Sequence, residues 1–124
     1  MLLESDSSVG AAIPKILYYS EHDKDSSNQM ARINSYGVLV NYTGIACPNL
    51  IDQPDHIDLP LTESACGGIF MFPREVYEKV GGFDEDLFLY HEDNDFSWRI
   101  RMMGWRLVAT SNAVCSHHYN FNKG

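Results

Sequence analysis

The residues best suited to chemistry lie in one stretch of twenty, residues 80–99. This stretch contains six acidic residues: Asp84, Glu85, Asp86, Glu92, Asp93 and Asp95. Aromatic residues bracket them at Phe83, Phe88, Tyr90 and Phe96. A solvated loop does not need aromatic residues of the kind usually found buried, and a plain core segment does not need so many carboxylates. We therefore interpret the stretch as the floor of an active site, in which the aromatic residues hold an acidic loop against the core.

The Glu92-Asp93 pair opens the strongest predicted helix of the chain, residues 92–103. Unpaired N–H groups and the positive end of the helix dipole favour carboxylates at this position, so ordinary capping also explains the pair. A carboxylate fixed on a rigid helix can instead act as a general base, which takes the proton of an alcohol as that alcohol attacks an electrophile. The clustering of acids around the pair favours the general base.

Arg99 and His117 are weaker candidates. Arg99 follows Asp95 by four residues, which favours an ordinary ion pair along the helix; the alternative is that it holds the acidic loop or a substrate phosphate. His117 and His118 end the last predicted strand and point to opposite faces, so at most one of them faces a given site. A histidine at a strand end is more often a surface residue than a metal ligand, and the local pattern does not decide between the two.

The elements that must position these residues alternate between strands and helices. Apolar runs predict strands at 16–19, 38–40, 66–72, 105–109 and 113–117. Pro73 precedes a short predicted helix at 74–80, which Gly81-Gly82 ends, and Gly104 ends the helix at 92–103. Polar residues at 20–28 predict a turn, and the prolines of 47–60 predict an irregular loop. Within the helix at 92–103, Phe96, Ile100 and Met103 form one apolar face. The alternation of strands and helices along the chain predicts an α/β fold.

Size and composition limit the classes of function. The 124 residues suffice for a single domain, and a formal net charge of −8 argues against a basic surface for nucleic acid. Three scattered cysteines predict neither a disulfide framework nor a zinc site and fit a reducing compartment. No apolar run is long enough to span a bilayer, and the first residues lack the pattern of a signal peptide. We therefore expect a cytoplasmic protein.

An ordered series of motifs runs through residues 65–118. Small residues at 66–68 lead into an apolar run and Arg74, followed by V-G-G-F-D-E at 80–85, F-x-Y-x-E-D-x-D at 88–95, R-x-R at 99–101, Gly104-Trp105 and a last strand at 113–117. Together these motifs resemble the C-terminal half of family 2 inverting glycosyltransferases of the GT-A fold, in particular the rhamnosyl- and galactofuranosyl-transferase-like members. The fold implied is a partial GT-A domain, a mixed sheet with flanking helices.

The resemblance implies a role for each candidate. Asp93 would be the catalytic base, deprotonating the acceptor hydroxyl for direct attack at the sugar C1 with inversion. Glu92, Gly67 and Gly68 would line the acceptor site, and Asp84 and Arg99 would support the acidic loop beside it. His117 would help to bind a divalent metal, Mn²⁺ or Mg²⁺.

The resemblance also implies the partners of the intact enzyme. These are a UDP- or dTDP-sugar donor and a glycan or lipid-linked acceptor, in the synthesis of cell-envelope polysaccharide at the inner face of the membrane.

The chain departs from the family pattern at its start. Such enzymes place a nucleotide-binding half first, ending in an Asp-x-Asp that holds the metal and the donor diphosphate, and no Asp-x-Asp precedes Ile13 here. We therefore expect residues 1–124 to be a fragment with little or no transferase activity, which retains no metal and could form a homo-oligomer over an exposed sheet edge. Two alternatives remain: a non-catalytic binding or assembly module derived from a glycosyltransferase, and a metal- or carbohydrate-binding domain without transfer chemistry.

Overall fold

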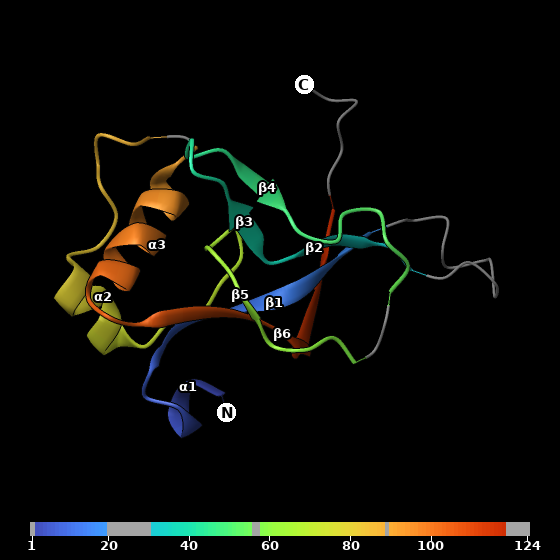
Figure 1. Ribbon diagram of the computed structural model, residues 1–124, viewed down its shortest axis with the longest axis horizontal. Helices are drawn as coiled ribbons and strands as arrows, with labels where there is room; N and C mark the ends of the chain where they lie inside the picture. Colours follow the sequence, from blue (N-terminus) through green and yellow to red (C-terminus); the bar gives the residue numbers. More distant parts are fainter. Residues whose placement is uncertain (1, 20–30, 56–57, 89, 119–124) are drawn as a thin grey trace.

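Two long strands form the centre of the molecule (Figure 1). The computed structural model describes residues 2–19, 31–55, 58–88 and 90–118. Strand β1 (Val9–Tyr18) runs parallel to β6 (Arg106–His117), and two short antiparallel strands complete the sheet in the order β2-β1-β6-β5. These are β2 (Ile33–Tyr36) beside β1 and β5 (Thr62–Glu63) beside β6. The strands β3 (Val38–Val40) and β4 (Ala46–Pro48) form a separate antiparallel hairpin.

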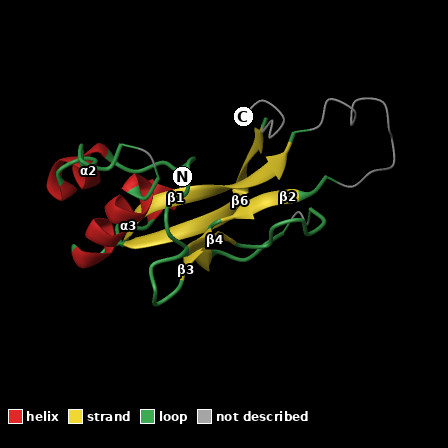
Figure 2. Cartoon of the chain, turned by 90° about the horizontal axis from the view of Figure 1, so that it is seen from above, coloured by secondary structure: helices red, strands yellow, loops and turns green. Residues whose placement is uncertain are grey.

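The longer helices lie together at one end of this sheet (Figure 2). They are α2 (Arg74–Val80) and α3 (Glu92–Met102), and a four-residue helix, α1 (Leu2–Ser5), precedes β1. Gly81 ends α2 in the left-handed region, with φ 92°, and its N–H donates to Tyr77 O at 3.0 Å. Both predicted helices and the predicted α/β class, a mixed sheet with flanking helices, are confirmed. Among the described residues, no helix has the length and apolar character needed to cross a bilayer.

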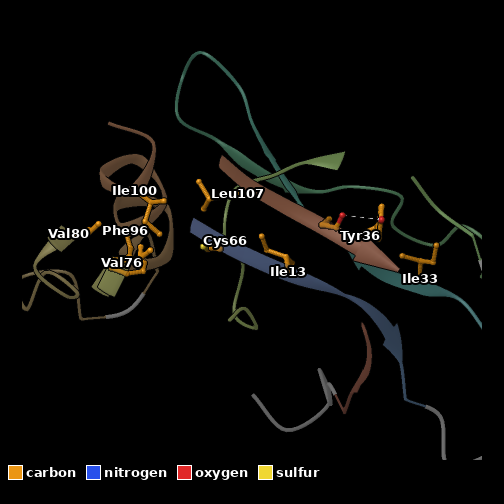
Figure 3. Close-up of a cluster of buried hydrophobic side chains, with 11 residues drawn as sticks. Ile13, Ile33, Tyr36, Cys66, Val76, Val80, Phe96, Ile100 and Leu107 are labelled. Atoms are coloured by element: carbon orange, nitrogen blue, oxygen red, sulfur yellow. Dashed lines mark hydrogen bonds between the residues drawn. The ribbon is translucent and has the colours of Figure 1, made fainter. Parts of the chain in front are cut away.

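The core joins the helices to the start of the two central strands (Figure 3). Phe96 and Ile100 of α3 are fully buried, and they pack with Val76 of α2 and with Leu107 of β6. The Phe96 ring lies 4.7 Å from Phe83, 5.1 Å from Phe72 and 6.2 Å from Phe70, measured between ring centroids. This aromatic cluster fixes α3 against the segments on either side of α2.

Three sequence predictions about the strands need correction. The buried strand at 66–72 is wrong: this segment meets β1 at a single bridge, Met71 with Ala12, and the Met71 side chain is exposed. The two strands predicted at 105–109 and 113–117 are one strand, β6. In the pairing of β1 with β6, Pro14 lies opposite Thr110 and Lys15 lies opposite Val114, so residues 111–113 form a bulge. In the sequence pattern this bulge looked like a gap between two strands.

Other boundaries shift less. β1 begins at Val9, well before the predicted 16–19, because its first residues are buried beside β6. β4 occupies the start of the loop predicted at 47–60. Met103 lies beyond the end of α3 and is exposed, so it does not extend the apolar face. The turn predicted at 20–28 lies outside the described residues.

Candidate active site

The first turn of α3 begins from a strained backbone. Tyr90 and His91 both have positive φ, 65° and 71°, which is unfavourable for residues other than glycine. No side chain caps the helix at His91, and Glu92 and Asp93 follow at once. Strain of this kind clusters at functional sites. Here the backbone of Tyr90 and His91 sets the direction in which the chain enters α3, and with it the position of the two carboxylates.

The fold changes the titration of Asp93 in this turn. Its side chain is partly buried, and burial raises the pKa of the carboxyl above its usual value, an effect to which the charge of Glu92 adds. A hydrogen bond from the Asn94 N–H to Asp93 Oδ1, 2.7 Å long, acts in the opposite direction and orients the carboxylate. A carboxylate with a raised pKa is a stronger proton acceptor once it is ionised.

Two further polar atoms of this turn make no hydrogen bond within the described part of the chain. Glu92 Oε2 and Asn94 Oδ1 are both buried, and neither has a hydrogen-bond partner among the described residues. Buried acceptors without partners are rare in folded proteins, because they lose water and gain nothing in return. Both oxygens are therefore suited to receiving a hydroxyl of a ligand.

A chain of two hydrogen bonds joins this turn to the segment that begins at Cys66. The Cys66 N–H donates to Ser97 Oγ, and Ser97 Oγ donates to Asp93 O, each at 2.7 Å. The Cys66 thiol is fully buried, and burial raises its pKa to about 12, so it stays a neutral packing group. The link holds Gly67 and Gly68 at a fixed distance from the head of α3.

Gly67, Gly68 and His117 line one hollow of about 250 Å³, which we call the glycine hollow. Its other walls are residues of β1, β2, β3 and β4 together with Ile69. A Cβ on Gly67 would lie 2.8 Å from Val38 Cγ2, so a side chain there would require Val38 to shift, whereas a Cβ on Gly68 would meet no atom within 4 Å. The structure thus brings together three candidate residues from distant parts of the sequence.

Comparison with known proteins identifies the family. Residues 53–122, more than half of the chain, match the family described as the N-terminal domain of galactosyltransferase. The chain belongs to this family. The resemblance to glycosyltransferases is thereby confirmed, and the mixed sheet with flanking helices is that of a partial nucleotide-sugar transferase domain of the GT-A type.

Two curated relatives have a more specific name. Over 58 residues the chain is 36% identical to the N-acetylglucosaminyl-diphospho-decaprenol L-rhamnosyltransferases of two Mycobacterium tuberculosis strains, CDC 1551 / Oshkosh and ATCC 25618 / H37Rv. The match covers 47% of this chain and 19% of the length of each relative. No solved structure matches the chain significantly.

The other predicted residues of this glycosyltransferase chain have structural partners. Arg99 forms the expected ion pair with Asp95, at 2.6 Å, and also donates to Val80 O at 3.0 Å, which fastens α3 to the end of α2. Asp84 is exposed, and its Oδ1 accepts the Asp86 N–H in a turn of its own. Their parts in acceptor binding stay predictions.

The predicted aromatic anchors of the acidic loop are wrong for two residues. Phe83 packs on Phe96, but the side chains of Phe88 and Tyr90 are 93% and 73% exposed. The turn at Asp84 explains the difference. Asp84 O accepts the Leu87 N–H at 3.2 Å, which closes a turn of exposed acidic residues just after Phe83.

The described residues do not by themselves fit a divalent metal. Among residues 2–19, 31–55, 58–88 and 90–118, no three His, Cys, Asp or Glu side chains lie close enough together to hold one. Mg²⁺ and Mn²⁺ prefer several oxygen ligands, which the His117 imidazole does not supply. His117 is thus a candidate for one ligand of a site and not a site by itself.

A second hollow was missed by sequence reasoning. Asn94, Ser97, Trp98 and Arg101 line a hollow of about 310 Å³ between α3, the strand β3 and residues 63–65, which we call the tryptophan hollow. These four residues recur at i, i+3, i+4 and i+7, so they form one stripe along α3. The signal was present in the sequence, but the apolar face of the same helix dominates the pattern.

Proposed function

We propose that this chain carries the catalytic base and the acceptor side of an inverting family 2 glycosyltransferase. Asp93 would remove the proton of the acceptor hydroxyl as that oxygen attacks C1 of the donor sugar. The bond from the acceptor oxygen to C1 would form while the bond from C1 to the nucleotide diphosphate breaks, which inverts C1. The observation that carries this proposal is the Asp93 carboxyl, partly buried with a raised pKa at the head of α3.

The neighbours of Asp93 support the same assignment. Glu92 has a buried oxygen without a partner among the described residues, and such an oxygen would accept a hydrogen bond from the acceptor hydroxyl before attack. The glycine hollow begins one residue after Cys66, which the Ser97 link holds beside the helix. Its open side at Gly68 leaves room for a sugar, whereas Gly67 lies close against Val38.

The names of the relatives and of the family indicate the classes of substrate. The named relatives are rhamnosyltransferases whose name includes a diphospho-decaprenol, and the matching family is a galactosyltransferase family. We propose a UDP- or dTDP-linked hexose or deoxyhexose as donor and a glycan or lipid-linked glycan as acceptor. A divalent metal, Mn²⁺ or Mg²⁺, belongs to the same proposal, with His117 as one ligand.

The decisive experiment is Asp93→Asn in the protein as its gene encodes it, assayed with a panel of UDP- and dTDP-hexoses. We expect kcat to fall by roughly 10²–10⁴-fold, the usual contribution of a general base. Glu78→Gln is the matched control, because that exposed carboxylate pairs with Arg74 on α2 and has no part in the proposal, and its kcat should stay near that of the wild type.

Two results would contradict the proposal. A wild-type rate in Asp93→Asn, with loss of activity in Glu92→Gln, would move the base to Glu92. Absence of transfer with every donor would favour the non-catalytic module. Residues 1–124 alone should show no turnover, and transfer by them would overturn the expectation that they lack the donor side.

A further inference from the structure

The tryptophan hollow lies along the same helix as the proposed base. It begins at Asn94, the residue after Asp93, and extends to Arg101. At 1.5 Å per helical residue this is a length of roughly 10 Å. Val38 lines both this hollow and the glycine hollow, so the two share a wall at the start of β3.

One side of the hollow is apolar. Trp98 is 55% exposed, and residues 38–40 of β3 line the same hollow, with Leu39 itself 51% exposed. A large aromatic ring left half in solvent on a helix with a well-packed opposite face is not needed for the core. It offers a flat apolar surface of the kind on which the C–H face of a pyranose ring can lie.

The other side of the hollow is polar and only partly committed to the fold. Asn94 Oδ1 is without a partner among the described residues. Arg101 contacts Ser64 O, at 2.5 Å, and Glu63 Oε2, at 3.8 Å. A guanidinium has five N–H donors, so these two contacts leave Arg101 able to donate to a ligand. Planar amide and guanidinium groups at the edge of an aromatic surface match the rim of hydroxyls around a sugar ring.

We propose that the tryptophan hollow binds a second sugar residue of a glycan acceptor. This proposal rests on the proposed function, because it places the acceptor hydroxyl at Asp93 and the adjoining sugar beside Trp98. The hollow's volume, about 310 Å³, lies at the lower end of the roughly 300–1,000 Å³ typical of small-molecule sites. The acceptor preferred by the protein is then at least a disaccharide and not a single sugar.

The test is calorimetric titration of the protein with N-acetylglucosamine and with its β-1,4-linked dimer, N,N′-diacetylchitobiose. We expect the dimer to bind more tightly than the monomer. Trp98→Ala should weaken dimer binding by about tenfold or more, the effect of truncating an aromatic anchor, and leave monomer binding within about twofold. Trp98→Phe should retain part of the affinity for the dimer that Trp98→Ala loses, and Asn94→Ala should also weaken dimer binding.

Met102→Ala is the matched control. Met102 lies on the same helix, is 82% exposed and does not line the hollow, so dimer binding should not change. Equal affinity for monomer and dimer, or an unchanged dimer affinity in Trp98→Ala, would overturn the proposal. Absence of binding by both sugars up to their solubility limits would overturn it as well.

A third variant separates this proposal from the proposed function. Asp93→Asn should still bind the dimer more tightly than the monomer, because Asp93 does not line the hollow that holds the second sugar. If dimer binding depends on Trp98 while transfer does not depend on Asp93, the subsite stands and the assignment of the base is wrong. If transfer depends on Asp93 while Trp98→Ala binds the dimer normally, the reverse holds.

Discussion

The first turn of α3 carries Glu92, Asp93 and Asn94, whereas the later turns carry Phe96, Ile100 and Arg99. The first turn follows two residues with positive φ, has no side-chain cap and holds two buried oxygens without partners among the described residues. The later turns fill the core and fasten the helix to α2. Within this helix of eleven residues, the first turn thus destabilises the fold and the later turns stabilise it.

The comparison indicates how a small domain can hold a partly buried carboxylate in place. Burial raises the pKa of Asp93 and opposes its ionisation, so the site is unfavourable by itself. The aromatic cluster around Phe96, one turn away, provides the packing that offsets this cost. If this account is correct, substitutions in the two parts should change stability in opposite directions.

The largest expected effect is that of Phe96→Ala. Phe96 is fully buried among four other aromatic rings, so its truncation should lower the free energy of unfolding by about 3–5 kcal/mol. Urea unfolding followed by circular dichroism measures this. Trp98→Ala on the exposed side of the same helix should cost far less, and similar losses in both variants would contradict the division of the helix.

A smaller loss is expected for Arg99→Met. Arg99 pairs with Asp95 and donates to Val80 O, both partly buried contacts, so its loss should cost about 1–2 kcal/mol in the same measurement. Arg74→Met is the matched control, because Arg74 forms a similar ion pair with Glu78 but is 90% exposed. Its loss should stay below about 0.5 kcal/mol, as is usual for surface pairs. Equal effects would show that the link to α2 contributes nothing.

The smallest effect should have the opposite sign. Because the pKa of Asp93 is raised in the folded protein, its ionisation destabilises the fold as the pH rises above 3.8, the usual pKa of an aspartate, and through the folded pKa. Asp93→Asn should therefore raise the melting temperature near neutral pH, and the gain should shrink as the pH falls toward 3.8.

Thermal unfolding over a pH series measures this gain, with Asp84→Asn as the exposed control. A gain that grows toward acid pH would refute the role of burial in the pKa of Asp93.

The sequence predicted the helices more accurately than the strands. Pro73, Gly81 and Gly104 are local signals for helix ends, and they act through the backbone of the same few residues. The supposed strand at 66–72 has an apolar run but lacks a neighbour, since only Met71 meets β1. The supposed anchors Phe88 and Tyr90 are exposed, because residue type does not tell which side of a turn faces the core.

By itself, the sequence determined the order of motifs, and with it the glycosyltransferase family and the Glu92-Asp93 pair at the head of a helix. Both are local properties, given by residue types at short spacing. The tertiary structure alone decided that Gly67, Gly68 and His117 share one hollow, that Ser97 links Asp93 to Cys66, and that Trp98 shares a hollow with β3. These contacts join residues tens of positions apart, and only the packing of strands and helices brings them together.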